Sequence, residues 1–313
     1  MSTGLVLGID VGGTKTHLRV EDMADRIVVD LVVPTTYWET TLEAKADKLA
    51  TLIRGVPSRL ERIVVGAHGC DTDADCEALA EHVQSRIDVP TVVVNDSLLL
   101  GPAAGYGHCI SLISGTGSIV LGSDSRGSTL YAGGWGWLVG DAGSAWGIVR
   151  DAVTLLTASA DRGQIDDILL NEMLGASSSA NLRDLVAYLE RSPAADWATW
   201  VPAVFRAAST GSMLAAEAIT QGAQTLSALV TTLLNRGAIA EAVVAAGGVI
   251  VNQPAFAEEL GRFLLRDNGL PLVIHSGPPV AGAVRLARQN SHGANPASRT
   301  PSPRQPSTLD SMF

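Results

Sequence analysis

The chain has 313 residues, 46% of them hydrophobic and 17% charged, which is enough apolar material for a large core and long for one compact domain. Its 22 Lys and Arg against 32 Asp and Glu give a net charge of -10, so no broad basic surface is available for a nucleic-acid backbone. Because no apolar run approaches the roughly 20 residues of a membrane helix and no basic leader precedes the first apolar residues, we expect a cytoplasmic protein of two domains that binds neither nucleic acid nor membrane.

The first third of the chain alternates strand and helix signals. Strand patterns, with β-branched or alternating apolar residues, occupy residues 4–10, 15–20, 27–33, 62–65 and 91–94. Helical periodicity occupies residues 38–53 and 73–87. Strands joined by helical crossovers are typical of an α/β layer with a partly parallel sheet.

The rest of the chain repeats this opening and then becomes helical. Two strand patterns, residues 109–113 and 119–122, flank a turn of small residues, which suggests a duplicated domain. A long helical region, a buried strand and two closing helices follow, at residues 144–234, 242–246, 254–265 and 280–288. The last segment, residues 290–313, is rich in Ser, Pro and Asn, a composition that predicts disorder.

Glycine marks the turn after the first strand. In Gly8-Ile9-Asp10-Val11-Gly12-Gly13-Thr14-Lys15-Thr16 the lysine does not directly follow the second glycine, so the pattern departs from a P-loop. The alternation that follows predicts a strand rather than a helix. Such a turn brings backbone N–H groups close to an anion, and Asp10 at the strand end can order water around Mg²⁺. An ordinary hairpin turn fits the same residues.

Two further turns have the same character. Ser114-Gly115-Thr116-Gly117-Ser118 offers N–H and O–H donors without side-chain bulk. Gly247-Gly248 follows a buried strand, and it either lets a flat base lie against the backbone or simply ends the strand. Each turn alone is weak evidence, and it is the ordered set of three that carries weight.

Two carboxylates and two tryptophans occupy positions suited to a small-molecule site. Asp96 follows a buried strand, at the end where open α/β sheets place ligands, and phosphoryl transfer needs a carboxylate that accepts the proton of the attacking hydroxyl. A helix N-cap is the alternative role. Trp135 and Trp137 stand among glycines and can face a sugar ring, with burial in a domain interface as the alternative. Asp141 can accept hydrogen bonds from sugar hydroxyls or cap the helix that starts near Ser144.

These motifs together resemble the BadF/BadG/BcrA/BcrD-type ATPase family and, within it, the N-acetylglucosamine kinase branch. The resemblance covers about residues 4–289, and its most specific piece is Gly133-Gly134-Trp135-Gly136-Trp137-Leu138-Val139-Gly140-Asp141-Ala142-Gly143-Ser144-Ala145-Trp146. It implies an α/β fold of two ribonuclease-H-like (actin-like ATPase) domains with ATP in the cleft between them. The implied domains are residues 1–103 and residues 104–289, the second with a helical insertion. The helix of residues 279–289 is a candidate to pack back on the first domain.

The resemblance also implies roles for particular residues. The first two turns would hold the phosphates of ATP and the third its adenosine, through Gly12, Gly13, Thr14, Lys15, Thr16, Ser114, Gly115, Thr116, Gly117, Gly247 and Gly248. Asp96 would be the catalytic base, and Asp10 would hold Mg²⁺ through water. The sugar pocket would include Trp38, Gly69, Trp135, Gly136, Asp141 and Ser144. The family carries other residues where this chain has Thr36, His68 and Ala142, and each change alters the hydrogen bonding available to a substrate.

The activity implied is ATP-dependent phosphorylation of a small-molecule amino sugar, N-acetylglucosamine first, on a ring-exocyclic hydroxyl. One alternative is an ATPase that energises a partner protein, but the members that do so carry a cysteine for an iron–sulfur cluster where this chain has Ser114. Another alternative is a sugar sensor without catalysis. The oligomeric state stays open, a homodimer included.

Overall fold

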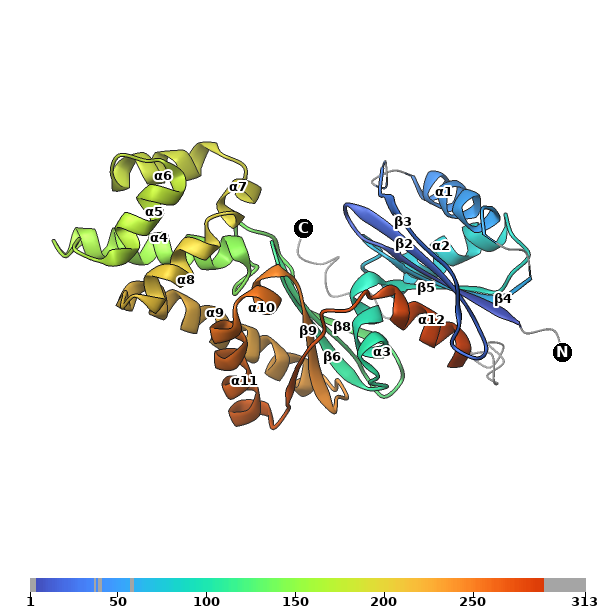
Figure 1. The fold of residues 1–313 in the computed structure, drawn as a ribbon. Helices are drawn as coiled ribbons and strands as arrows, with labels where there is room; N and C mark the ends of the chain where they lie inside the picture. Colours follow the sequence, from blue (N-terminus) through green and yellow to red (C-terminus); the bar gives the residue numbers. More distant parts are fainter. Residues whose placement is uncertain (1–3, 37, 39–40, 57–58, 290–313) are drawn as a thin grey trace, which may run out of the picture.

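The computed structural model describes residues 4–36, 38, 41–56 and 59–289. The tail predicted to be disordered, residues 290–313, lies outside the described residues. The chain forms two lobes, each built on a five-stranded mixed sheet with helices packed on it (Figure 1). The expected α/β class with two related sheets is confirmed.

The first lobe opens the chain. Its elements are β1 (Leu5–Val11), β2 (Lys15–Asp22), β3 (Ile27–Pro34), α1 (Leu42–Arg54), β4 (Leu60–Ala67), α2 (Asp73–Gln84), β5 (Thr91–Asn95), the 3₁₀ turn η1 (Asp96–Leu99) and α3 (Leu100–Ala104). The sheet order is β3-β2-β1-β4-β5, with β1, β4 and β5 parallel and β2 antiparallel to both its neighbours. Side chains alternate across β1, so that Leu7 and Ile9 pack against α1 and α2 while Val6 faces the opposite layer.

The second lobe repeats this sheet. Its strands are β6 (Cys109–Ser114), β7 (Ser118–Ser123), β8 (Thr129–Gly133), β9 (Ala242–Ala246) and β10 (Leu272–Ile274). They follow the order β10-β9-β6-β7-β8, again with three antiparallel strands from consecutive hairpins and two strands added in parallel. The two sheets therefore have the same connectivity, which agrees with the duplication suggested by the two glycine-turn hairpins.

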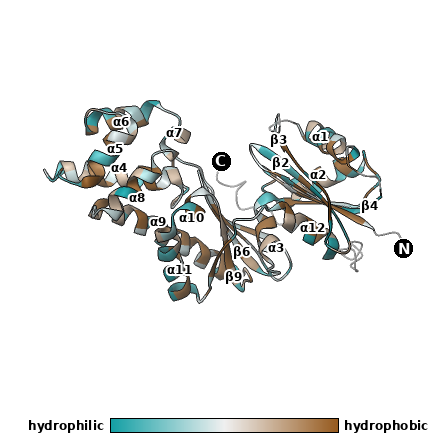
Figure 2. Ribbon diagram, in the orientation of Figure 1, coloured by the Kyte–Doolittle hydropathy of each residue, from teal (hydrophilic) through white to brown (hydrophobic). Residues whose placement is uncertain are grey.

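A helical insertion separates β8 from β9. It comprises α4 (Ala145–Asp161), α5 (Ile168–Ser177), α6 (Leu182–Arg191), α7 (Ala194–Ala198), α8 (Val201–Ser209) and α9 (Met213–Asn235). The helical prediction for residues 144–234 is confirmed. Two more helices, α10 (Gly248–Asn252) and α11 (Pro254–Asn268), follow β9, and α11 lies along α9. Figure 2 shows hydrophobic strands at the centre of the sheets, whereas surface helices such as α11 carry both hydrophilic and hydrophobic residues.

The last described helix, α12 (Val280–Gln289), returns to the first lobe. Ala283, Val284 and Ala287 are buried against Val6 of β1 and Leu99 of η1. An ion pair between Arg288 and Glu21 of β2 lies at the end of this helix. The packing of α12 thus covers the face of the first sheet that α1 and α2 leave open.

Some boundaries differ from the sequence predictions. The first helix begins at Leu42 instead of residue 38, because the Thr41 side chain caps it by accepting a hydrogen bond from the Ala44 backbone N–H. Strands β8 and β10 were not predicted. They are short, with five and three residues, and they are held by pairing with β7 and β9 rather than by a strong pattern of their own.

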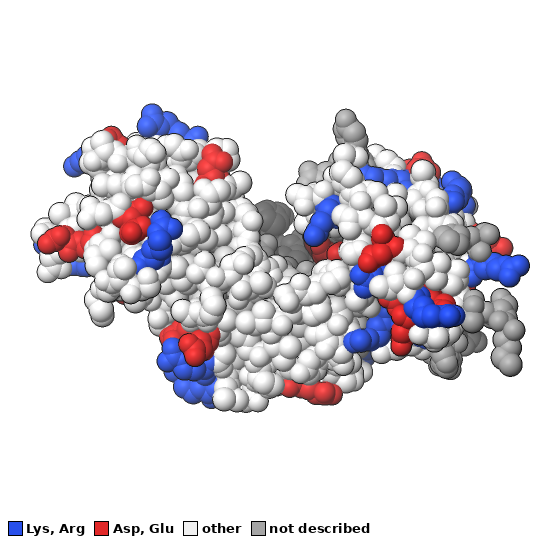
Figure 3. All heavy atoms as spheres, in the orientation of Figure 1, with Lys and Arg blue, Asp and Glu red and all other residues white. Residues whose placement is uncertain are grey.

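The molecular surface is hollowed between the two lobes on the face shown in Figure 3. Acidic and basic side chains are scattered over that face without a large field of one sign. Among the described residues, no helix combines the length and the apolar character needed to cross a membrane.

Candidate active site

Three parallel strands of the first lobe end side by side. Strands β1, β4 and β5 are paired so that their last residues lie in register, at Val11, Ala67 and Asn95. Asp10, His68 and Asp96 each directly adjoin one of these residues in the chain. The sheet therefore brings the two predicted carboxylates, Asp10 and Asp96, to one edge and places His68 between them along that edge, at the carboxyl end where such sheets bind ligands.

Asp96 is the first residue of η1 and is held by the start of that turn. Its Oδ1 accepts a hydrogen bond of 2.9 Å from the Ser97 backbone N–H, which also donates to the Asn95 side chain at 3.0 Å. The N-cap of this turn is therefore Asn95, and the Asp96 carboxylate accepts a hydrogen bond from the same Ser97 N–H. Since the Asp96 side chain remains 23% exposed, its carboxylate is positioned by the backbone and still open to a substrate hydroxyl.

Asp10 is partly buried near the end of β1. Burial raises the pKa of Asp10 to about 7, with a further contribution from the negative charge of Asp96 and an opposing effect of Lys15. A carboxylate whose charge is disfavoured by burial and by a neighbouring carboxylate is typical of a functional centre. The carboxylate oxygens of Asp10 and Asp96 are the kind of ligand that hard divalent cations prefer.

The first glycine turn, residues 12–16, is closed by backbone contacts. The Gly12 N–H donates to the Lys15 carbonyl at 3.0 Å. Gly13, Thr14 and Lys15 are exposed, whereas Thr16 is buried and its hydroxyl lies 2.8 Å from that of Thr35. The structure thus leaves the tip of this turn open to a ligand and uses Thr16 to join β2 to the segment after β3.

The second and third turns, residues 114–118 and 247–248, contact each other in the second lobe. Gly247 has φ +113, and a Cβ at this position would lie 2.4 Å from the Ser114 carbonyl oxygen, so only glycine fits. Ser114 itself is buried and donates from Oγ to the Gly143 carbonyl at 2.7 Å. The Ala145 N–H at the start of α4 donates to the Gly115 carbonyl at 2.8 Å. Two segments whose contacting residues, Ser114 and Gly247, are 133 positions apart in the chain therefore form one small-residue surface.

This surface borders a pocket of about 350 Å³. Three of its lining residues, Gly115, Thr116 and Gly248, belong to the predicted ATP-binding set. The sequence analysis missed the remainder of the lining, which comes mainly from the insertion and from α10: Ala145, Ala195, Ala198, Thr199, Val201, Pro202, Val249, Asn252 and Gln253. Apart from Ala145, which belongs to the motif of residues 133–146, these residues carry no motif, and the packing of α7, α8 and α10 beside the turns brings them into the pocket.

We expect Gly247→Ala to disrupt this pocket. The added methyl would meet the Ser114 carbonyl, and the backbone conformation itself costs an alanine about 1–3 kcal/mol. Gly237→Ala is the matched control, because Gly237 also has a positive φ, of +99, but no described atom lies within 4 Å of an added Cβ. A nucleotide titration should show lost ATP affinity for Gly247→Ala alone, while both variants lower the melting temperature. Equal ATP affinities in the two variants would contradict a role for the Gly247–Ser114 contact in ATP binding.

The glycine-rich loop before α4, residues 133–143, exposes Trp135. The Asp141 carboxylate holds this loop by accepting hydrogen bonds from the Gly136 N–H at 3.2 Å and from the Trp146 indole at 3.0 Å. Burial raises the pKa of Asp141, and these hydrogen bonds oppose the rise. Arg150, which the sequence analysis missed, donates to the Trp137 and Gly140 carbonyls. Hydrogen bonds to the Asp141 carboxylate and from the Arg150 guanidinium therefore hold the backbone of this loop in place.

Three alternatives for this loop are decided by the structure. Burial of Trp135 in a domain interface is wrong, because its residue is 69% exposed. Trp137 is 41% exposed, so it is not buried in an interface either, and its ring meets that of Trp197 in a T-shaped arrangement with centroids 5.2 Å apart. The carboxylate of Asp141 does not cap α4, since the cap is the Ser144 hydroxyl, which accepts from the Gly147 N–H at 3.1 Å. Asp141 shapes the loop through its carboxylate and receives the Ser144 N–H and O–H at its carbonyl.

Trp38 lies beneath the loop that follows β4. Its residue is only 6% exposed, and its indole N–H donates to the His68 carbonyl at 2.7 Å. The structure therefore shows Trp38 supporting the His68-Gly69 segment more than facing an open pocket. Gly69, with φ +70, is exposed beside it.

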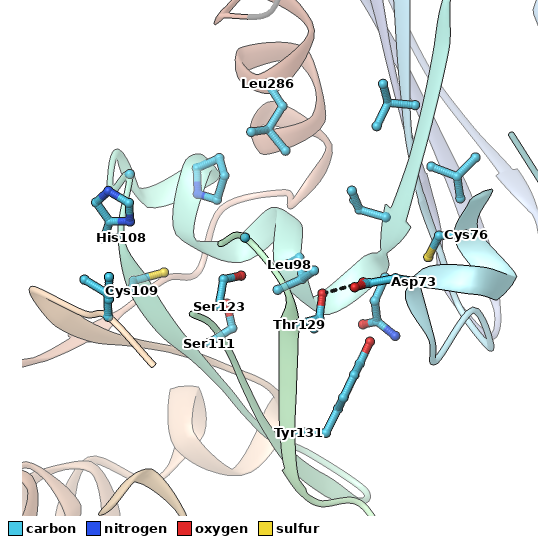
Figure 4. Close-up of a pocket in the computed structure, with 18 of the residues that line it drawn as sticks. Asp73, Cys76, Leu98, His108, Cys109, Ser111, Ser123, Thr129, Tyr131 and Leu286 are labelled. Atoms are coloured by element: carbon cyan, nitrogen blue, oxygen red, sulfur yellow. Dashed lines mark hydrogen bonds between the residues drawn. The ribbon is translucent and has the colours of Figure 1, made fainter. Parts of the chain in front are cut away.

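A separate pocket of about 410 Å³ lies between the lobes (Figure 4). It is lined by α2 and β5 of the first lobe and by β6 and β8 of the second, and its described lining includes none of the site residues predicted above. Across it the Thr129 hydroxyl donates to the Asp73 carboxylate at 2.9 Å. This hydrogen bond links the edge of the second sheet to the first turn of α2.

Comparison with known proteins finds sugar kinases that are similar over nearly the whole chain. The N-acetylmuramic acid/N-acetylglucosamine kinase of Clostridium acetobutylicum is 26% identical over 299 residues, which cover 90% of this chain and 98% of the relative. The N-acetyl-D-glucosamine kinase of Dictyostelium discoideum is 23% identical, with 92% and 98% covered. The crystal structure of a candidate N-acetylglucosamine kinase from Chromobacterium violaceum superposes with a TM-score of 0.65 at 22% identity, covering 92% of this chain and all of that one, a likeness of fold.

The family-level comparison covers nearly the whole described chain. The model of the BadF/BadG/BcrA/BcrD ATPase family matches residues 7–284, from β1 to α12. The match includes the strand-end carboxylates, all three glycine turns and the loop that carries Trp135. The resemblance drawn from the sequence motifs is thereby confirmed, and this chain belongs to the BadF/BadG/BcrA/BcrD ATPase family.

Proposed function

We propose that this protein is an ATP-dependent kinase of an amino sugar, with N-acetylglucosamine as the first candidate substrate. The observation that carries the proposal is the pair Asp10 and Asp96, which the parallel strands β1 and β5 bring to one edge of the sheet on either side of β4. In the second lobe, two of the glycine turns border a pocket. Relatives similar over nearly their whole length are named as kinases of N-acetylglucosamine and N-acetylmuramic acid. Family membership alone supports ATP use.

In this proposal Asp96 removes the proton of the sugar hydroxyl as that oxygen attacks the γ-phosphate. Its carboxylate is oriented by the Ser97 N–H and stays partly exposed, as a general base must be. The open tip of the first turn and the second turn supply small-residue backbone where the phosphates would lie. The pocket beside Gly248 and α7 would hold the adenosine.

The donor chemistry at Asp10 suits Mg²⁺. A partly buried carboxylate whose charge is opposed by Asp96 gains stabilisation from a hard divalent cation, and it would hold that cation through water. When bound, Mg²⁺ neutralises negative charge on the phosphates. The protein's own part is to place the Asp10 carboxylate at the end of β1, where a bound cation would favour its ionised form, and to leave the Asp96 carboxylate to accept the proton of the sugar hydroxyl.

A sugar panel tests the proposal directly. ADP release from the purified protein is measured with ATP, Mg²⁺ and N-acetylglucosamine, N-acetylmuramic acid, glucosamine or glucose. We expect turnover only when an amino sugar is added. Steady ADP release without sugar would instead support an ATPase that drives a partner protein. The iron–sulfur cluster expected of such an ATPase has no counterpart among the described residues, which contain no cluster of metal-ligating side chains. Sugar binding without any ADP release would support a sensor.

The sugar specificity gives a further prediction. We expect a higher kcat/KM for N-acetylglucosamine than for glucose, because pocket groups built for the amide would be left unpaired by glucose, at about 1–3 kcal/mol per group. We expect Trp135→Ala to lower kcat/KM for both N-acetylglucosamine and glucose, since it removes an exposed aromatic face on which either sugar ring can stack. Met213→Ala, at an equally exposed apolar residue on α9, is the control and should change neither. Glucose equalling N-acetylglucosamine would refute the specificity and spare the kinase assignment.

A further inference from the structure

His68 extends from β4 into the site with its backbone held at both ends. Its N–H donates to the Val11 carbonyl at 2.9 Å, which ties it to the end of β1. Its carbonyl accepts the Trp38 indole N–H at 2.7 Å. The His68 side chain is 52% exposed, so its ring is accessible in the site. These two backbone hydrogen bonds fix the point from which the His68 side chain extends.

The two nitrogens of the His68 ring face different parts of the site. Nδ1 lies 3.7 Å from Oδ2 of Asp96. Nε2 lies 4.0 Å from the point that a Cβ on Gly13 would occupy, so the ring also borders the tip of the first turn. The Asp96 carboxylate is therefore approached from two sides, by the Ser97 N–H at Oδ1 and by the His68 ring at Oδ2.

We propose that His68 is a positioning residue for Asp96, an inference that rests on the kinase function proposed above. The Nδ1–H of His68 would close on Oδ2 when the substrate is bound, as hydrogen bonds at catalytic groups often do. With Oδ1 held by Ser97, this contact fixes the plane of the carboxylate and directs the remaining lone pair of Oδ2 toward the sugar hydroxyl. The role needs one donor at the Nδ1 position and no charge on the ring.

Three variants of His68 separate this role from a general structural one. His68→Asn keeps an N–H donor near the place of Nδ1, His68→Gln puts its amide nearer to Nε2, and His68→Ala has neither. Because misplacement of a reacting group by about 1 Å can cost 10²-fold, we expect His68→Ala and His68→Gln to lose about 10- to 100-fold in kcat with the KM for ATP unchanged. We expect His68→Asn to stay within a few-fold of the wild type. His82→Ala, at another partly exposed histidine on α2, should change nothing.

A double-mutant cycle completes the test. If His68 acts through Asp96, His68→Ala should add no further loss of kcat in an Asp96→Asn background, a strong departure from additivity. The proposal is overturned if His68→Ala keeps the wild-type kcat, if His68→Gln equals His68→Asn, or if the losses at His68 and Asp96 multiply. Failure of the kinase function is a separate result, since it appears as absent sugar-dependent ADP release in the wild-type protein.

Discussion

Replacing Asp96 with Asn is expected to lower the kcat of sugar-dependent ADP release by about 10²- to 10⁴-fold, the usual cost of losing a general base. The amide keeps the shape of the side chain and can still accept the Ser97 N–H through its oxygen, but it cannot take the proton of the attacking hydroxyl. ATP affinity should change little, because the pocket proposed for the nucleotide lies in the other lobe. Steady-state kinetics together with a nucleotide titration measure both quantities.

Asp161→Asn is the matched control for this variant. Asp161 is an exposed carboxylate at the end of α4, and its substitution should leave kcat and ATP affinity unchanged. The Asp96→Asn protein should also melt at no lower temperature than the wild type, since removing the Asp96 charge relieves Asp10. Turnover within a few-fold of the wild type would remove Asp96 from the mechanism.

Asp10→Asn is expected to stabilise the protein at alkaline pH while abolishing its activity. The pKa of Asp10 rises from its ordinary value of 3.8 to about 7 in the folded chain. Between these two pH values the folded state keeps a proton that the unfolded state has lost, so stability falls as the pH rises through this window. At about 1.36 kcal/mol per pKa unit, the carboxylate costs on the order of 4 kcal/mol above pH 7.

The asparagine variant cannot ionise and should avoid this cost. In the absence of Mg²⁺ we expect its melting temperature to exceed that of the wild type by several degrees at pH 8 and to match it near pH 4. Millimolar Mg²⁺ should raise the melting temperature of the wild type, because a ligand that binds only the folded state stabilises that state. The melting temperature of the variant should not change, because it lacks the Asp10 carboxylate. Thermal unfolding followed over this pH range measures both effects.

Equal melting temperatures of wild type and Asp10→Asn at pH 8 would show that the folded chain tolerates the Asp10 charge without cost. Asp22→Asn serves as the opposite control, because the hydrogen bond from the Arg26 backbone N–H holds the pKa of Asp22 below its usual range. Loss of the stabilised Asp22 charge in Asp22→Asn should destabilise the protein at neutral pH. The two aspartates thus distinguish a carboxylate kept for function from one kept for structure.

Much of the fold follows from local patterns that the sequence carries openly. The strand–turn–strand signals around the first two glycine turns, the crossover helices and the long helical region all reflect periodicities of two or 3.6 residues, which depend on near neighbours in the chain. The family was likewise recognisable from residues 133–146 and the three turns, because glycine is required where backbone approaches backbone, as at Gly247 against Ser114.

The arrangement of the site was only partly predictable. Asp10 and Asp96 could be placed at strand ends, but the elevated pKa of Asp10 arises from burial and from the charge of a residue 86 positions away in the chain. Arg150 and the pocket lining from α7 and α8 carry no motif, and they reach the site through helix packing. Such contacts join residues distant in the chain, and no local propensity encodes them.

Trp38 and His68 show most clearly where the sequence alone was sufficient and where it was not. Both residues stand out in the printed chain, one as an expected pocket aromatic and the other as a departure from the family. Only the tertiary structure shows that Trp38 is buried and donates to the His68 carbonyl, and that the His68 ring lies beside Asp96. The parallel pairing of β1, β4 and β5 decides this, because it brings the ends of three separate strands within side-chain reach of one another.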